Sequence, residues 1–441
     1  MNVLINVLHG SALAIPVITL ITLWYRRRGI EIDHIFLFSA GFIFYLVLPF
    51  TLAQSSFFSV YRASSTYGVW EKAFGLVTLE TWAWYFISVL LLYCAFILGS
   101  WLASREPSQT APVKNSIDPT ALNIFFAGAI FFVTIFGYQL RDYFFWSYQK
   151  STQIPIFGSF VASSILLMSV AVCAIVYRYY RNDTKRSFLK SLLHPAVISY
   201  GIVAVLLLSM GGRIIVVTSL MILAVFFSVY IRRLRLLTVA ALFVLLVILS
   251  HIIVLWRMGF PSEILNPQQY YNIRGLAIAL CSENFDVGYS LIHFLGTYSL
   301  PLIRFPVVLL SGVIGLIPSF IFPGKTAWIL GFPSLGYSIG NLAGGLNVYV
   351  SLAINFGILG ASVFLFMLSY ALQGLKQYAS SITTVIYVLV SGWLAAEFFR
   401  DFEQTILKEI LEFSVLMPFA LLVLSRIIVK MKKNSSPNPA V

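Results

Sequence analysis

The stretch TWAWYFISVLLLYCAFILGSWLA, residues 81–103, contains no Asp, Glu, Lys or Arg. A helix needs about 20 predominantly apolar residues to cross the roughly 30 Å hydrocarbon core of a bilayer. Runs of this kind recur along the chain and alternate with short polar loops. They predict an all-α, polytopic transmembrane bundle that forms a single integral membrane domain over residues 1–441.

The composition also indicates an integral membrane protein. The chain of 441 residues is 59% hydrophobic and only 10% charged, whereas soluble domains are about half apolar and about a quarter charged. Alternating segments of about ten residues, typical of an outer-membrane barrel, do not occur. We predict about eleven crossings, at residues 3–24, 34–53, 81–103, 121–139, 156–177, 194–211, 213–231, 236–256, 346–371, 380–399 and 410–429.

Clusters of basic residues predict the orientation of the bundle. They follow five of the predicted crossings, at residues 26–28, 178–190, 232–235, 376 and 430–433. With eleven crossings all five fall on one side, which the positive-inside rule assigns to the cytoplasm. The amino terminus is then outside and the carboxyl terminus inside. These inner loops explain the net charge of +13, which therefore gives no indication of a nucleic-acid partner.

One long stretch, residues 257–345, does not have the pattern of a membrane crossing. It contains Arg274, Arg304 and Lys325 among turns rich in proline and glycine. Residues 289–322 within it are apolar enough to enter the membrane, while both ends must stay outside to preserve the charge pattern. We predict a re-entrant or interfacial helical pair, or two short crossings. Because irregular backbone at that depth is tolerated only against protein or water, an outward-facing cavity is expected beside it.

Several function classes lack their motifs in this sequence. There is no G-x-x-x-x-G-K-[ST] and no G-x-G-x-x-G after a strand pattern, which argues against a nucleotide-driven pump. The three cysteines, Cys94, Cys173 and Cys281, lack the C-x-x-C spacing of a metal or redox site. No zinc-type His/Glu pattern appears either. We expect no metal and no cofactor.

Four basic residues from separate segments are predicted at the outer side: Arg213, Arg274, Lys325 and Arg400. A charged side chain at helix depth costs about 2.5–3.5 kcal/mol on insertion scales, so those that persist are functional candidates. Converging cations suit an anionic ligand, and the arginine fork suits phosphate. The alternative for each is an anchor at the lipid headgroups.

A transfer to a hydroxyl group would also need a base near the acceptor. The outward groups able to act as that base are Asp286, Glu397, Asp401, Glu403 and His293, and sequence alone leaves all five open. Glu397 also fits an ion pair with Arg400 three residues on. His293 lies in an apolar phrase and also fits a structural histidine.

Taken in order, these residues resemble the Wzy-type oligosaccharide repeat-unit polymerases of bacterial surface polysaccharide synthesis, including O-antigen and enterobacterial common antigen polymerases. The resemblance covers roughly residues 200–405. It is carried by Gly211-Gly212-Arg213, by Arg274 ahead of Glu-Asn-Phe-Asp, by Ile317-Pro-Ser-Phe-Ile-Phe-Pro-Gly-Lys325, by Asn347-x-Tyr349, by Asn355-Phe-Gly-Ile-Leu-Gly360 and by Arg400. Lys325 departs from relatives that have Arg there, and a lysine lacks bidentate geometry.

The resemblance implies an inverting, metal-independent glycosyltransferase of the GT-C type in a bacterial inner membrane, with a periplasmic active site. Its substrates are undecaprenyl-pyrophosphate-linked oligosaccharides, and the growing glycan passes to an incoming repeat unit. A chain-length regulator protein is a possible partner, together with membrane lipid. The carried-over roles are pyrophosphate binding for Arg213, Arg274, Lys325 and Arg400, and catalysis for Arg274 and Arg400. Glycan binding is expected of Asn347, Tyr349 and Asp286.

Two other functions stay open beside the polymerase. An O-antigen ligase shares the architecture but gives its glycan to lipid A-core. A transporter or flippase would move lipid-linked glycans without changing their glycosidic bonds.

Overall fold

The structure is a computed structural model. It describes residues 2–54, 77–105, 127–131, 133–135, 138, 164–166, 168–177, 193–209, 213–242, 244, 287–299, 302–314, 317, 321–338, 346–378, 381–394, 397–400, 410–416, 419–420, 423–424, 426–428 and 430–431.

Four helical segments of the described chain are long and apolar enough to cross a membrane: Val3–Arg27, His34–Thr51, Leu79–Ala103 and Val348–Gln377. They match four of the predicted crossings, at 3–24, 34–53, 81–103 and 346–371. The all-helical class is therefore confirmed, since the described residues contain no strand beyond one isolated bridge. The total of about eleven crossings remains a prediction.

The elements of these four segments are α1 (Asn2–Arg27), α2 (His34–Phe42) with η1 (Ile43–Val47) and α3 (Leu48–Gln54), α5 (Leu79–Ala103) and α16 (Val348–Gln377). The shorter elements are α9 (Pro195–Ser209), α10 (Arg213–Phe226), η5 (Phe227–Ile231), α15 (Val307–Ile314), η6 (Lys325–Trp328), η7 (Phe332–Leu335), α17 (Ser381–Trp393), α18 (Glu397–Arg400) and η8 (Ile410–Leu416). Residues 287–297 are also helical.

Polar residues between the apolar runs start the long helices. Asp33 caps α2, because its Oδ1 accepts from the Phe36 N–H at 3.0 Å. Thr78 caps α5 through Thr81, and Asn347 caps α16 by accepting from the Tyr349 N–H at 2.8 Å. Each cap satisfies a backbone donor that the first helical turn leaves unpaired.

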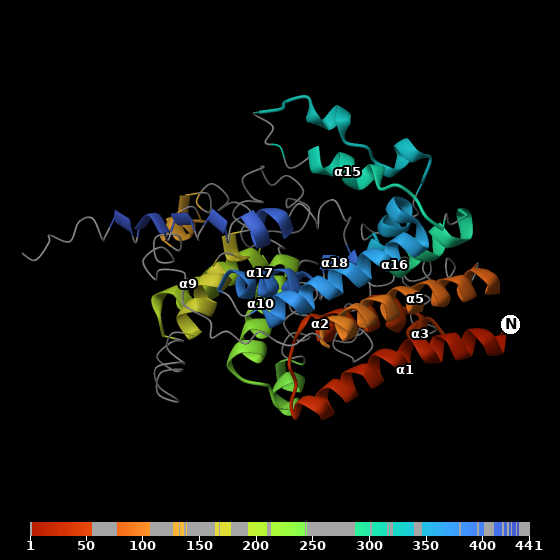
Figure 1. Ribbon diagram of the computed structural model, residues 1–441, viewed down its shortest axis with the longest axis horizontal. Coiled ribbons are helices and arrows are strands. Elements are labelled where there is room, and N and C mark those ends of the chain that lie inside the picture. Colours follow the sequence, from red (N-terminus) through yellow and green to blue (C-terminus); the bar gives the residue numbers. More distant parts are fainter. Residues whose placement is uncertain are drawn as a thin grey trace, which may run out of the picture.

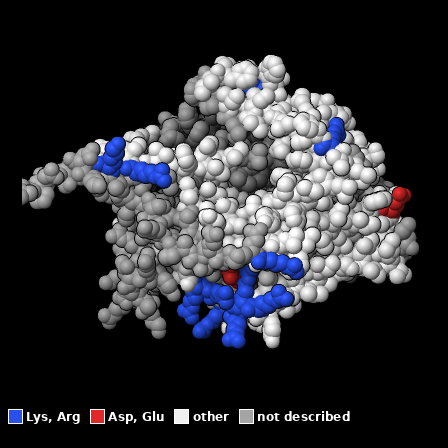
Figure 2. Space-filling model, viewed as in Figure 1, with Lys and Arg blue, Asp and Glu red and all other residues white. Residues whose placement is uncertain are grey.

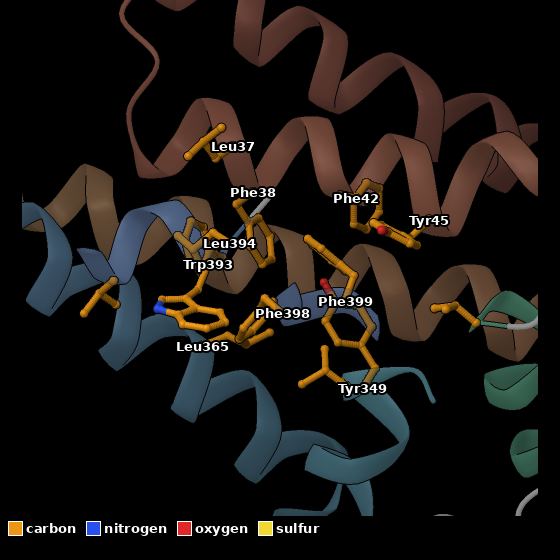
Figure 3. Packing of buried hydrophobic residues seen from close by; sticks show 14 of the residues in the cluster. Leu37, Phe38, Phe42, Tyr45, Tyr349, Leu365, Trp393, Leu394, Phe398 and Phe399 are labelled. Carbon is orange, nitrogen blue, oxygen red and sulfur yellow. The ribbon is translucent and has the colours of Figure 1, made fainter. Parts of the chain in front are cut away.

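Helices α2, α5 and α16 enclose a core rich in aromatic side chains (Figure 3). Phe38 of α2 stacks on Phe96 of α5 with ring centroids 3.7 Å apart. A Cβ at Gly99 of α5 would overlap the Phe366 carbonyl oxygen of α16, so glycine permits the close approach of these helices. Figure 1 shows α5 lying between α16 and α1.

One end of the bundle gathers three of the predicted basic clusters. Ile30, after α1, forms an isolated antiparallel bridge with Leu234, after η5. Lys376, near the end of α16, contacts both Glu31 and Asp33. The residues around 26–28, 232–235 and 376 therefore lie at one end, as the charge pattern predicts. We call it the basic end.

A hairpin of short elements, residues 302–338, packs on α16 at a kink. Gly357 has φ 72° and ψ 173° inside the helix, a conformation open essentially to glycine alone. The groups freed by the kink pair with the hairpin: Arg304 N–H donates to the Phe356 carbonyl (2.9 Å), and Leu359 N–H to the Leu302 carbonyl (3.1 Å).

The described helices of this hairpin are too short to cross a bilayer. Helix α15 has 8 residues, and η6 and η7 have 4 each, against about 20 needed for a span. The arrangement of residues 289–322, as a re-entrant or interfacial pair or as two short crossings, stays a prediction. Residues 257–286 of the long stretch lie outside the described residues.

Candidate functional site

The candidate site lies at the end of the bundle opposite the basic end. Helix α16 has 30 residues and runs from this end to Lys376, a path of about 45 Å at 1.5 Å per residue. The Arg400 carbonyl accepts from the Leu346 N–H at 3.0 Å, directly before α16 begins. Arg400 is therefore far from the basic end.

Arg213 lies at the same end as Arg400. It is the first residue of α10, which continues through η5 to the bridge residue Leu234 at the basic end. Helix α17 packs antiparallel to α10 and η5, with Tyr387 against Tyr230 of η5 and Gly392 against Ile222 of α10. The end of α17 therefore lies beside the middle of α10, and α18 follows it in the sequence.

Two phenylalanines hold the backbone of Arg400 in place. Phe398 is 4% exposed and Phe399 is fully buried, and Figure 3 shows both rings between α2 and α16. The ring of Phe399 lies 5.3 Å from that of Phe38 and 6.1 Å from that of Tyr349, centroid to centroid. Arg400 itself is half-buried. The apolar pair thus presents the arginine at the rim of the core.

The predicted glycan-binding residues Asn347 and Tyr349 are buried beneath α18. Asn347 is fully buried; its N–H donates to the Ser290 hydroxyl at 3.0 Å and its Oδ1 caps α16. Tyr349 is 1% exposed, so its side chain has almost no contact with solvent. The arrangement gives Asn347 a structural role and leaves neither side chain open to a glycan in this conformation. Glycan binding by either stays a prediction.

The Ser290 contact brings a third segment to this end. Ser290 belongs to helix 287–297, which also carries His293. His293 is half-buried beside the Tyr289 ring, with centroids 5.9 Å apart, while its neighbours Ile292 and Phe294 are buried. His293 therefore sits on the outer side of a helix that docks against the start of α16.

Lys325 is held within the hairpin. Its ammonium donates to the Ile317 carbonyl at 2.5 Å, which closes the Ile317–Lys325 phrase on itself. Leu309 N–H donates to Asn355 Oδ1 at 2.9 Å, so Asn355 seats the start of α15 on α16. The structure thus ties Lys325 to the same end as Arg400 through the α16 kink and the hairpin, without a described contact that joins the two side chains.

The remaining predicted residues are only partly described. Glu397 begins α18, and its backbone alone is described. Arg274, Asp286, Asp401 and Glu403 lie outside the described residues. The structure therefore brings together Arg400, Asn347, Tyr349 and the helix of His293, and places Arg213 at the same end.

Sequence reasoning missed two features. Arg304 makes contacts that the sequence did not predict: its guanidinium donates to the Tyr337 hydroxyl and lies 5.2 Å from the centroid of that ring. The hairpin packs on α16 at the Asn355-Phe-Gly motif. A glycine inside an otherwise regular apolar run was the feature of the sequence that could have indicated this break in the helix.

A buried ion network at the basic end was also missed. Asp33 is fully buried and accepts from Arg27 at 2.7 Å and from Lys376 at 2.8 Å. Burial alone would raise the pKa of the Asp33 carboxyl, but Lys376 and Arg27 outweigh burial and hold that pKa well below its ordinary value. Next to it, His34 contacts the hydroxyls of Tyr387 and Ser100.

Within the described part of the chain, no three His, Cys, Asp or Glu side chains gather as a metal site. Comparison with protein-family models, with curated proteins and with solved structures finds no match for this chain.

Proposed function

We propose that the protein is a membrane glycosyltransferase that polymerises lipid-linked oligosaccharide repeat units at the outer face of a bacterial inner membrane. The observation that carries the proposal is the position of Arg213 and Arg400. Both α10 and α16 end at the basic end, and their other ends bring these two arginines to the opposite face. The positive-inside rule makes that opposite face the outer one.

The chemistry proposed for this face is glycosyl transfer from a lipid pyrophosphate. A hydroxyl oxygen of the acceptor repeat unit attacks the anomeric carbon of the growing glycan and inverts it. The bond between that carbon and the pyrophosphate oxygen breaks, and the hydroxyl proton passes to a base. Pyrophosphate leaves with the electron pair of the broken bond.

The proposed roles follow from that charge flow. Arg213, Arg274, Lys325 and Arg400 stabilise the departing pyrophosphate, since preorganised cations act strongly in a partly dry site. The base is one of Asp286, Glu397, Asp401, Glu403 and His293. The pyrophosphate bond supplies the driving energy, so the reaction needs neither ATP nor a nucleotide sugar.

An elongation assay tests the proposal. The purified full chain is given undecaprenyl-pyrophosphate-linked repeat units alone, and the products are separated by size. A ladder of longer lipid-linked glycans is expected. Products that appear only after lipid A-core is added would instead identify a ligase.

A transporter of lipid-linked glycans is the second candidate, and the ion network at the basic end favours it. Asp33 and its neighbour His34 are fully buried ionisable groups where α2 begins, and carboxylate and histidine pairs of this kind serve as proton relays in transporters. In proteoliposomes, movement of the lipid-linked unit across the bilayer with unchanged glycan length would support this candidate. Elongation without such movement would exclude it.

A further inference from the structure

Two segments that are far apart in sequence hold a set of arginines together at the basic end. The Ile30 N–H donates to the Leu234 carbonyl at 3.0 Å, and the Leu234 N–H donates back at 2.8 Å. Arg233 also donates to the Arg27 carbonyl. Residues 26–30 and 232–235 are therefore fixed against each other.

The contacts divide these basic residues into two classes. Arg27, Arg233 and Lys376 form ion pairs with Glu31 or Asp33. Four other arginines are exposed and form no ion pair among the described residues. We call these four the arginine patch: Arg26, Arg28, Arg232 and Arg235. Figure 2 shows the blue side chains gathered along this edge of the molecule.

The backbone turns the arginine patch outward. Arg28 has φ 52°, and the Gly29 N–H donates to the Trp24 carbonyl at 3.3 Å. A left-handed residue of this kind terminates a helix and satisfies its last carbonyls. The chain reverses at this point, so that Arg26 and Arg28 remain on the surface while Arg27 turns to the acids.

Exposed apolar side chains flank the arginine patch in both segments. Trp24 is 45% exposed and Tyr25 81% exposed directly before Arg26, and Leu236 and Leu237 are 57% and 82% exposed directly after Arg235. Tryptophan and tyrosine concentrate where a bilayer meets water. The arginine patch therefore lies at the height of the lipid headgroups, at the edge of the membrane-facing surface.

We propose that the arginine patch binds the phosphate headgroups of anionic phospholipids in the leaflet at the basic end. Guanidinium groups pair with phosphate through two parallel N–H donors. The two acids described beside the site, Glu31 and Asp33, are already engaged by Arg27, Arg233 and Lys376. The apolar flanks favour a lipid over an acidic soluble protein, because a lipid offers acyl chains beside its charge. This site is separate from the proposed reaction at the opposite face.

Quenching of tryptophan fluorescence by brominated lipids tests the proposal. The full chain is reconstituted in phosphatidylcholine vesicles that contain either brominated phosphatidylglycerol or brominated phosphatidylcholine. Trp24 reports on the site, and a Trp24→Phe variant supplies the signal of the other tryptophans. Phosphatidylglycerol is expected to quench Trp24 preferentially. The double variant Arg28→Gln/Arg235→Gln should reduce that preference by about five-fold for each charge removed.

Matched variants separate lipid binding from folding. Arg28→Lys/Arg235→Lys should keep a preference for phosphatidylglycerol, and Arg304→Gln, on the hairpin, should leave it unchanged. In the unaltered chain, raising the ionic strength from about 0.01 M to about 1 M shortens the screening length from about 30 Å to about 3 Å and should weaken the preference. Equal quenching by both lipids in the unaltered chain would overturn the proposal. So would full displacement by inorganic phosphate, which would indicate a site for free anions.

Discussion

At the scale of single residues, Arg400 combines a fixed backbone with a half-buried position at the rim of the core. Its neighbours Phe398 and Phe399 are packed in the core, and its carbonyl binds Leu346. If this arginine stabilises the departing pyrophosphate, Arg400→Ala should slow elongation by about 100-fold or more. Arg400→Lys should recover little, because an ammonium lacks the bidentate fork.

The control for the Arg400 variants is to show that they still fold. Thermal unfolding of the purified variants should stay close to that of the unaltered chain, since the alanine keeps both phenylalanines. Glycan lengths like those of the unaltered protein in Arg400→Ala would contradict its role.

Asp33 is the residue on which the basic end depends. Removing one partner of a buried ion pair leaves the other charge unpaired and costs about 3–5 kcal/mol. Asp33→Asn should therefore lower the unfolding temperature clearly, whereas Glu31→Gln, at a less buried carboxylate, should lower it less. Equal effects of the two variants would contradict the ranking.

The same carboxylate gives the stability of the bundle a pH dependence. The folded-state pKa of Asp33 lies below its ordinary value of 3.8, so its contribution is present above that value and is lost as the pH falls towards the folded-state pKa. Unfolding temperature should drop below about pH 4 in the unaltered chain. In Asp33→Asn this part of the drop should be absent.

At the scale of elements, the kink in α16 and the hairpin on it form one unit. Every residue except glycine is strained at the Gly357 backbone angles, by about 1–3 kcal/mol. Gly357→Ala should destabilise the protein and expose the hairpin to protease. Gly374→Ala is the matched control on the same helix, because a Cβ there meets open space, and alanine suits a helix interior better than glycine. Similar behaviour of the two variants would contradict the proposed role of the kink.

The hydrogen bonds between the kink of α16 and the hairpin also limit how far the hairpin can move. If the hairpin left α16, the Phe356 carbonyl and the Leu359 N–H would lose their partners, which is costly at membrane depth. We therefore expect the described residues of the hairpin to act as a fixed wall of the site.

At the scale of the whole molecule, hydropathy and charge predicted the helical class, four spans and the shared end of three basic clusters. These follow from local composition and from the bilayer. The pairing of Asp33 with Lys376 could not be predicted, because the residues are 343 positions apart and both had the appearance of ordinary loop charges. The kink at Gly357 was hidden inside a run that reads as one unbroken crossing, 346–371. Burial of Asn347 and Tyr349 likewise depends on α18 folding over them.

The central claim is that the end carrying Arg213 and Arg400 builds polysaccharide from lipid-linked units. Elongation of undecaprenyl-pyrophosphate-linked repeat units by the purified chain tests it most directly, with Arg213→Ala and Arg400→Ala run beside the unaltered protein. We predict a ladder of products for the unaltered protein and none beyond the starting unit for either variant. Failure of the unaltered, folded protein to lengthen any repeat unit, or a normal ladder in both variants, would contradict the account.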